Sequence, residues 1–241
     1  MSIAGKRSRF PTTRWTLLIT VGGGRSPEAD AALATLCETY WYPLYGFLRC
    51  RGRNPEDAAD LTQAFFLHLL EKRALGRADS ARGRFRTFLL TSLTNFVANE
   101  HERKVALKRG GVMEHLSLDL EAAEGLLQRE YSTDETPERI FDRRWAQTLL
   151  ARVMERLREE TPEDKRVQLD QLKQYLSGDS GDDSYRQTAA RLGTTEGAVR
   201  VAVSRLRRRF RDLVRAEIEH TVATPEEVTD EIRYLLSVIR N

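Results

Sequence analysis

The chain has few of the residues on which disulfide frameworks, metal sites and membrane spans depend. Its 241 residues include two cysteines and four dispersed histidines, too few and too widely spaced for a disulfide framework or a zinc site. The apolar run at residues 17–21 is far shorter than the ~20 residues of a membrane span. We therefore expect no metal or other cofactor, no membrane partner and a cytoplasmic location.

Catalytic motifs and strand patterns are missing as well. There is no Ser-His-Asp order or nucleophile elbow, and the glycine run at residues 22–24 lacks the Lys-Ser/Thr pair of a phosphate loop. These absences predict a protein that is not an enzyme and has no catalytic residues. No segment alternates apolar and polar residues over a useful length, whereas apolar residues at helical spacing recur along the chain. The fold class that we expect is all-α.

Changes in composition divide the chain into two small helical domains joined by a flexible linker. The linker is acidic and ends in Ser132-Thr-Asp-Glu-Thr-Pro137. Within the first domain, Asn54-Pro55 predicts a helix start, with Asn54 as the N-cap. The predicted limits are an N-terminal arm and short helix at 1–27, a first domain at 28–109, the linker at 110–137, a second domain at 138–220 and a C-terminal helical extension at 221–241.

Residues 185–210 are the most informative segment. They predict two helices joined by a tight turn at Gly193, with Thr194 or Thr195 capping the second helix. Between residues 200 and 215 there are seven arginines against one acid, Asp212. A short helix, a glycine turn and a basic helix give the helix-turn-helix geometry that places one helix in the major groove of DNA. The predicted buried positions are Ala189, Ala190 and Leu192 in the first helix and Val199, Val203, Leu206 and Phe210 in the second.

Two segments of the first domain also have polar side chains at helical spacing. A helix beginning near Arg84 and ending near Lys108 combines cations with Asn and Thr, which suit phosphate and base-edge contacts respectively, although such a helix is often only solvated. The segment 57–70 carries acids beside apolar groups on the face opposite its core stripe, which suggests a protein contact. Acids that merely stabilise a helix N-terminus are the alternative there.

In this order, the three segments resemble the RNA polymerase sigma factors of the extracytoplasmic-function type. The motifs that carry the resemblance are Asp57-Ala-Ala-Asp-Leu-Thr-Gln-Ala-Phe-Phe66, residues 83–96, and Ala189-Ala-Arg-Leu-Gly-Thr-Thr-Glu-Gly-Ala-Val-Arg200. The resemblance covers residues 28–109 and 138–217. It implies a transcription initiation factor that binds RNA polymerase core and promoter DNA.

The resemblance also implies roles for particular residues. Contact with core polymerase falls to Asp57, Asp60, Gln63 and Phe66. The loop 74–83 and the following helix would bind the −10 element, with one base flipped from the stack, through Arg84, Arg86, Thr91, Asn95, Asn99, Arg103 and Lys104. The −35 element would be read by Arg200, Ser204, Arg205, Arg207 and Arg208.

Some positions depart from the family pattern, and two other functions stay open. Val201 and Ala202 stand where a small polar and a basic residue are usual, which puts base contacts there in doubt, and Ala64 replaces a frequent acid. The extension at 221–241 either packs on the protein itself, which we favour, or binds an inhibitory regulator. The alternatives are a stand-alone helix-turn-helix regulator that binds an operator, and a helical adaptor whose arginines meet an acidic protein.

Overall fold

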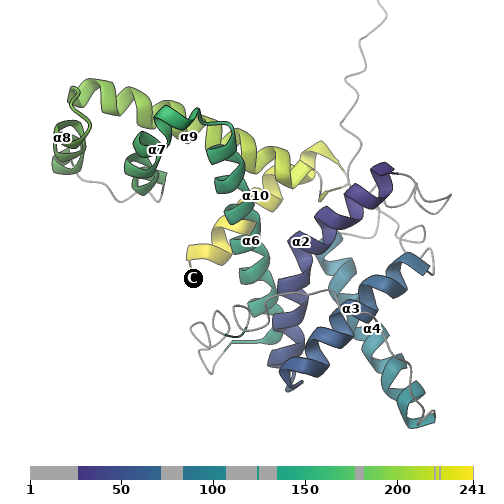
Figure 1. Ribbon diagram of the computed structural model, residues 1–241. Helices are drawn as coiled ribbons and strands as arrows, with labels where there is room; N and C mark the ends of the chain where they lie inside the picture. Colours follow the sequence, from purple (N-terminus) through teal and green to yellow (C-terminus); the bar gives the residue numbers. More distant parts are fainter. Residues whose placement is uncertain are drawn as a thin grey trace, which may run out of the picture. The chain divides into compact units, whose positions relative to one another are not determined.

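The computed structural model describes residues 27–71, 84–106, 124, 135–176, 182–219, 221–222 and 224–240, and every element there is helical (Figure 1). The prediction of an all-α fold is confirmed. None of the described helices is long and apolar enough to cross a membrane. The predicted N-terminal arm, the loop 74–83 and all of the linker before residue 135 except Glu124 lie outside the described residues.

The chain divides into two compact units, and each is described by itself. One unit takes residues 1–148 together with 218–241, and the other takes residues 149–217. The limits of these units follow from how the helices pack. The domain limits expected from composition and motifs describe functional segments instead, and they stay predictions.

Three helices form the centre of the first unit. They are α2 (Pro27–Cys50), α3 (Pro55–Glu71) and α4 (Phe85–Ala106), with α3 packed against both neighbours. The predicted cap at the start of α3 is confirmed, because the backbone N–H of Asp57 donates to the side-chain oxygen of Asn54 at 2.7 Å. Aromatic rings fill the space between the helices. Buried positions include Tyr40, Leu44, Phe47, Leu48, Leu61, Phe65, Leu69, Phe85, Leu89, Leu93 and Phe96.

The start of α6 (Pro137–Glu159) and the C-terminal helix α10 (Pro225–Arg240) complete the first unit. Trp145 on α6 and Val228 on α10 are fully buried, and Leu235 is 1% exposed. The extension therefore packs on the protein itself, as the sequence favoured. Its apolar positions follow a helical spacing, and one stripe of the helix is buried. Leu236 and Ile239 lie outside that stripe and are 48% and 43% exposed.

The second unit contains a short helical pair, α7 (Arg166–Leu172) and α8 (Asp182–Arg191), and most of the long helix α9 (Glu196–Glu219). Two short 3₁₀ segments, Glu163–Lys165 and Lys173–Leu176, flank α7. A cluster of apolar side chains fills the space between α7, α8 and the first part of α9. Its buried members are Leu172, Tyr175, Tyr185, Ala189, Val199 and Val203, with Leu192, Ala202 and Leu206 at its edge.

The turn between α8 and α9 forms as predicted. Gly193 has φ of 61°, and the N–H groups of Thr194 and Gly193 donate to the carbonyls of Ala189 and Ala190, which is the Schellman arrangement that favours glycine. Thr195 caps α9, because its hydroxyl accepts from the N–H of Ala198 at 3.2 Å.

One of the predicted core positions in this motif was wrong. Ala190 is exposed, whereas Leu192, Leu206 and Phe210 are half-buried. Ala190 lies one residue beyond the buried Ala189, so it is turned away from the cluster by a helical step. Phe210 lies on α9 one turn beyond Leu206, which itself is only at the edge of the cluster.

Candidate nucleic-acid interface

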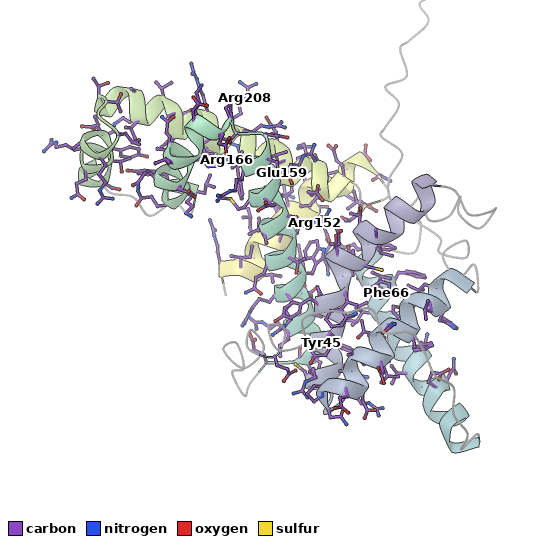
Figure 2. The ribbon with its side chains drawn as sticks, viewed as in Figure 1. Tyr45, Phe66, Arg152, Glu159, Arg166 and Arg208 are labelled. Carbon is purple, nitrogen blue, oxygen red and sulfur yellow. The ribbon has the colours of Figure 1, made fainter. Side chains whose placement is uncertain are left out.

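The outer face of α9 combines arginines with one apolar side chain. Arg200, Val201, Ser204, Arg205 and Arg208 are all exposed, and Arg208 is labelled on α9 in Figure 2. The Arg200 guanidinium pairs with Glu196 one turn earlier at 2.8 Å and lies over the Tyr185 ring at 4.5 Å. This face offers charged donors, a hydroxyl and the methyl groups of Val201, which is 50% exposed.

Two other arginines of α9 bind within their own unit. The Arg207 guanidinium donates through Nε and Nη2 to the backbone carbonyl of Tyr175, at 3.0 and 2.8 Å. Arg209 forms a bidentate pair with Glu160 at 2.7 and 2.6 Å, and this hydrogen bonding lowers the pKa of Glu160. The sequence suggested one continuous basic face along α9. Arg207 does not belong to it, because its guanidinium binds the backbone carbonyl of Tyr175 in the 3₁₀ segment Lys173–Leu176. Helical spacing alone does not show which arginine faces its own fold.

A hollow of about 300 Å³ lies beside the outer face of α9. Its lining residues are Tyr185, Arg200, Val203, Ser204, Arg207 and Arg211. Three of the six are arginines and two others carry hydroxyl groups, so the hollow suits an anionic group such as a phosphate.

The helix α4 presents a polar stripe. Thr91, Asn95 and Asn99 are exposed and lie four residues apart, so they share one side of the helix. Thr87 is also exposed, one turn before Thr91; the sequence predictions missed it, although the four-residue spacing was the signal that could have found it. Arg103 and Lys104 belong to α4, and their side chains lie outside the described part of the molecule.

Arg84 and Arg86, predicted to bind DNA, lie against α10 and α6 instead of on that stripe. Arg86 is 6% exposed, and its guanidinium donates from Nε to Glu231 at 2.7 Å and from Nη1 to Asp142 at 2.9 Å. Burial acts to lower the pKa of Arg86, but hydrogen bonding to Glu231 and the charges of Glu231 and Asp142 outweigh it, so the pKa is raised. Arg84 pairs with the same Glu231 at 2.9 Å. Both side chains thus bind acidic groups of the same unit in this conformation, and their role at the −10 element stays a prediction.

The acidic face of α3 is exposed in part. Asp57 and Asp60 are exposed and Gln63 is half-buried, as expected for a contact surface. Phe66 does not belong to this surface: it is 5% exposed and its ring lies 6.0 Å from that of Phe65, within the helical unit (Figure 2). Phe66 lies one turn after the fully buried Thr62, so it follows the core stripe. Its neighbour Leu67 is 41% exposed and continues the acidic face.

No group of His, Cys, Asp and Glu side chains within the described ranges could hold a metal ion. What this part of the molecule presents is two polar or basic helical faces, on α4 and α9, and one acidic face, on α3. Such surfaces suit binding to nucleic acid and to protein.

Comparison with known proteins assigns the helical group α2–α4 to a protein family. No curated protein and no solved structure matches the chain significantly. Residues 36–106, which include most of α2 and all of α3 and α4, match the family model described as Sigma-70 region 2. The chain therefore carries a Sigma-70 region 2 domain, which supports a factor of the sigma-70 family.

Proposed function

We propose that this protein is a sigma factor of the extracytoplasmic-function type, which binds RNA polymerase core and directs it to promoters that it then helps to open. The observation that carries the proposal is the Sigma-70 region 2 match over α2–α4 in a chain that also contains an arginine-bearing helix after a tight turn. The function requires no covalent chemistry, since binding energy at two DNA elements supports separation of the duplex strands.

The contact with core polymerase falls to the exposed part of α3. Asp57 and Asp60 supply charge, Gln63 supplies an amide, and the exposed Leu67 adds an apolar group beside them. An interface of this kind combines an apolar centre with a polar rim. Phe66 has no part in it because it is buried.

The −10 element falls to the polar stripe of α4. Thr87, Thr91, Asn95 and Asn99 offer hydroxyl and amide groups to bases and to the strand backbone. Arg103 and Lys104 follow on the same helix and supply charge for upstream phosphates. Flipping one base from the stack costs a few kcal/mol, which these contacts offset.

The −35 element falls to the outer face of α9. Arg200, Ser204, Arg205 and Arg208 are the exposed polar groups there, and arginine binds phosphate and guanine edges bidentately. We assign Arg207 to the fold instead, because its guanidinium is bound to the Tyr175 carbonyl.

Run-off transcription with purified full-length protein, core polymerase and genomic DNA fragments tests the proposal. The expected result is a set of transcripts that require both protein and core. A stand-alone regulator would bind its duplex tightly without core and give no core-dependent transcript, and that outcome would reject the sigma-factor function. A helical adaptor does not touch DNA, so filter binding would show none of the steeply salt-dependent DNA binding that phosphate contacts give.

The polymerase contact has its own matched pair of variants. Asp60→Ala is expected to weaken capture of core polymerase while circular dichroism and the melting temperature stay unchanged, because Asp60 is exposed. Glu56→Gln removes an exposed charge from the first turn of the same helix and serves as the control. Equal capture by both variants and the natural protein would remove α3 from the interface.

A further inference from the structure

Glu231 on α10 accepts hydrogen bonds from Arg86 in the first turn of α4 and forms an ion pair with Arg84, the residue before that helix. Arg86 donates from Nε to one carboxylate oxygen at 2.7 Å and from Nη2 to the other at 3.4 Å. Arg84 adds a third contact, from its Nε at 2.9 Å. Arg86 and Glu231 are 145 residues apart in sequence, and Glu231 is 2% exposed, so this is a specific long-range arrangement within the first unit.

Further groups keep the two guanidinium groups in position. Arg86 also donates from Nη1 to Asp142 on α6 at 2.9 Å, and its Cζ lies 4.0 Å from the Tyr234 ring centre and 5.3 Å from that of Trp145. The Cζ of Arg84 lies 5.2 Å from the Tyr234 ring centre. Tyr234 lies on α10 as well, so it would leave together with Glu231. Asp142 would still hold Arg86 through Nη1, with the Trp145 ring beside it, while the Nε/Nη2 edge of Arg86 and the Nε of Arg84 would lose their carboxylate partner.

The free edges would present converging donors from two guanidinium groups, one of which keeps its ion pair with Asp142. A guanidinium edge matches the oxygen spacing of a phosphate as well as that of a carboxylate. The site lies at the N-terminal end of α4, on the helix that the proposed function places against the −10 strand.

We propose that Arg84 and Arg86 form a binding site for a backbone phosphate of the −10 strand, and that the Glu231 carboxylate occupies this site in the free protein. The proposal rests on the sigma-factor function proposed above and adds a competition to it. The helix α10 excludes the DNA strand from part of α4 until it is displaced, so the C-terminal segment sets how readily the protein engages open promoter DNA.

The packing of α10 explains why the competing carboxylate, Glu231, lies on a helix other than α4. Val228 and Leu235 are buried on the same unit, so α10 docks by an apolar stripe and places Glu231 at the arginines. Displacing α10 exposes that stripe and breaks a buried ion pair, both of which cost free energy. Contacts of the holoenzyme with the promoter must therefore supply that free energy. Binding of the −10 strand at Arg84 and Arg86 thus requires that the promoter is already engaged elsewhere.

The first test measures affinity for DNA in the holoenzyme, with a fluorescein-labelled single strand that spans the −10 element of a promoter found by run-off transcription. Glu231→Gln keeps the shape of the side chain and removes its charge. Asp230→Asn is the control, because Asp230 is exposed on the same helix and pairs with Arg233 at 2.8 Å. We expect Glu231→Gln to bind the strand at least about fivefold more tightly than Asp230→Asn, with a salt slope steeper by about 0.7 for each further phosphate that the protein neutralises.

Adding Arg84→Gln to Glu231→Gln shows whether the tighter binding passes through the site. The proposal expects the increase in affinity and slope to fall in the double variant to no more than half of that in Glu231→Gln. Equal affinity and slope in Glu231→Gln and Asp230→Asn would overturn it, and so would an increase that Arg84→Gln leaves intact. Run-off transcription by the unaltered protein separates the two hypotheses: transcripts without these effects reject the competition alone, whereas no transcript rejects the sigma-factor function.

Hydrogen exchange on the unaltered protein decides the matter if Glu231→Gln fails to fold. Backbone amides of residues 226–240 are expected to exchange faster in the promoter complex than in the free chain, because α10 leaves its site. Equal protection of these amides in the two states would overturn the proposal.

Discussion

The Arg144 side chain fills the space that a side chain at position 46 would need. A Cβ atom on Gly46 would lie 2.7 Å from Cδ and 2.8 Å from Nε of Arg144, closer than carbon and nitrogen atoms pack. Arg144 is 1% exposed and its Cζ lies 4.5 Å from the Tyr42 ring centre, so it has little room to move. The absence of a side chain at position 46 of α2 is what allows Arg144 of α6 to pack against that helix.

Gly46→Ala is therefore expected to destabilise the protein by about 1–3 kcal/mol through overpacking. Urea unfolding followed by circular dichroism measures this. Gly197→Ala is the control, because Gly197 lies near the start of α9 and a Cβ there meets nothing within 4 Å. It should be neutral or stabilising by up to about 1 kcal/mol. Equal stability of the two variants would show that Arg144 adjusts without cost.

The sequence predicted the helices and the turn well because these depend on local chemistry. Asn54-Pro55, Gly193 and Thr195 act through backbone groups a few residues away, and all three perform the expected structural roles. Helical spacing also identified most core positions. Phe66 was misassigned because both of its neighbours in the sequence are apolar, so the side of the helix that is buried could not be read from the pattern alone.

The partners of the arginines could not be predicted, because they lie far away in sequence. Arg86 meets Glu231 and Arg207 meets the Tyr175 carbonyl, and no local spacing indicates either contact. An arginine that binds DNA and one that binds its own fold look alike in sequence. The three-dimensional neighbours decide between them, which is why the proposed DNA surfaces are smaller than the basic segments suggested.

Glu124 makes a pH-dependent contribution to stability. Arg49 donates to both of its carboxylate oxygens, at 2.6 and 2.9 Å, and the Tyr45 hydroxyl donates to it as well. Hydrogen bonding from Arg49 is the main cause that holds the pKa of Glu124 below its ordinary value of 4.5. The stabilisation is therefore fully present above pH 4.5 and is lost as the pH falls through the lower pKa of the folded state.

Glu124→Gln should accordingly lower the free energy of unfolding by about 1–3 kcal/mol at pH 7. The difference from the unaltered protein should shrink as the pH falls below 4.5, as measured by thermal melts across the acid range. Glu138→Gln serves as the control, since its ion pair with Arg51 at 3.5 Å is about half exposed and contributes about 0–1 kcal/mol. A difference for Glu124→Gln that does not depend on pH would contradict the assignment.

Arg205 and Arg207 are two residues apart on α9. Replacing Arg205 is expected to affect promoter binding, whereas replacing Arg207 is expected to affect the stability of the fold. Arg205 is exposed, so Arg205→Ala should cost about 1–3 kcal/mol of promoter discrimination if it reaches a base, with unfolding unchanged. Arg207→Ala should lower the free energy of unfolding by about 1–3 kcal/mol, because it removes both hydrogen bonds to the Tyr175 carbonyl. Binding to matched and mismatched −35 duplexes, together with urea unfolding, checks both. An equal loss on every DNA sequence would make Arg205 a phosphate contact.

Val201 is expected to read a thymine methyl group in the −35 element. It is 50% exposed on the outer face of α9, between Arg200 and the exposed pair Ser204 and Arg205, and apolar side chains contact the C5-methyl of thymine in the major groove. Replacing the contacted thymine by deoxyuracil removes only that methyl group, and Val201→Ala removes only the other side of the contact. Each change should weaken binding by about 1 kcal/mol, as expected for one apolar group removed from water, and the two together should cost little more than either alone. Full additivity at every thymine of the element would show that Val201 lies away from the bases and that the specificity of α9 comes from its arginines and Ser204.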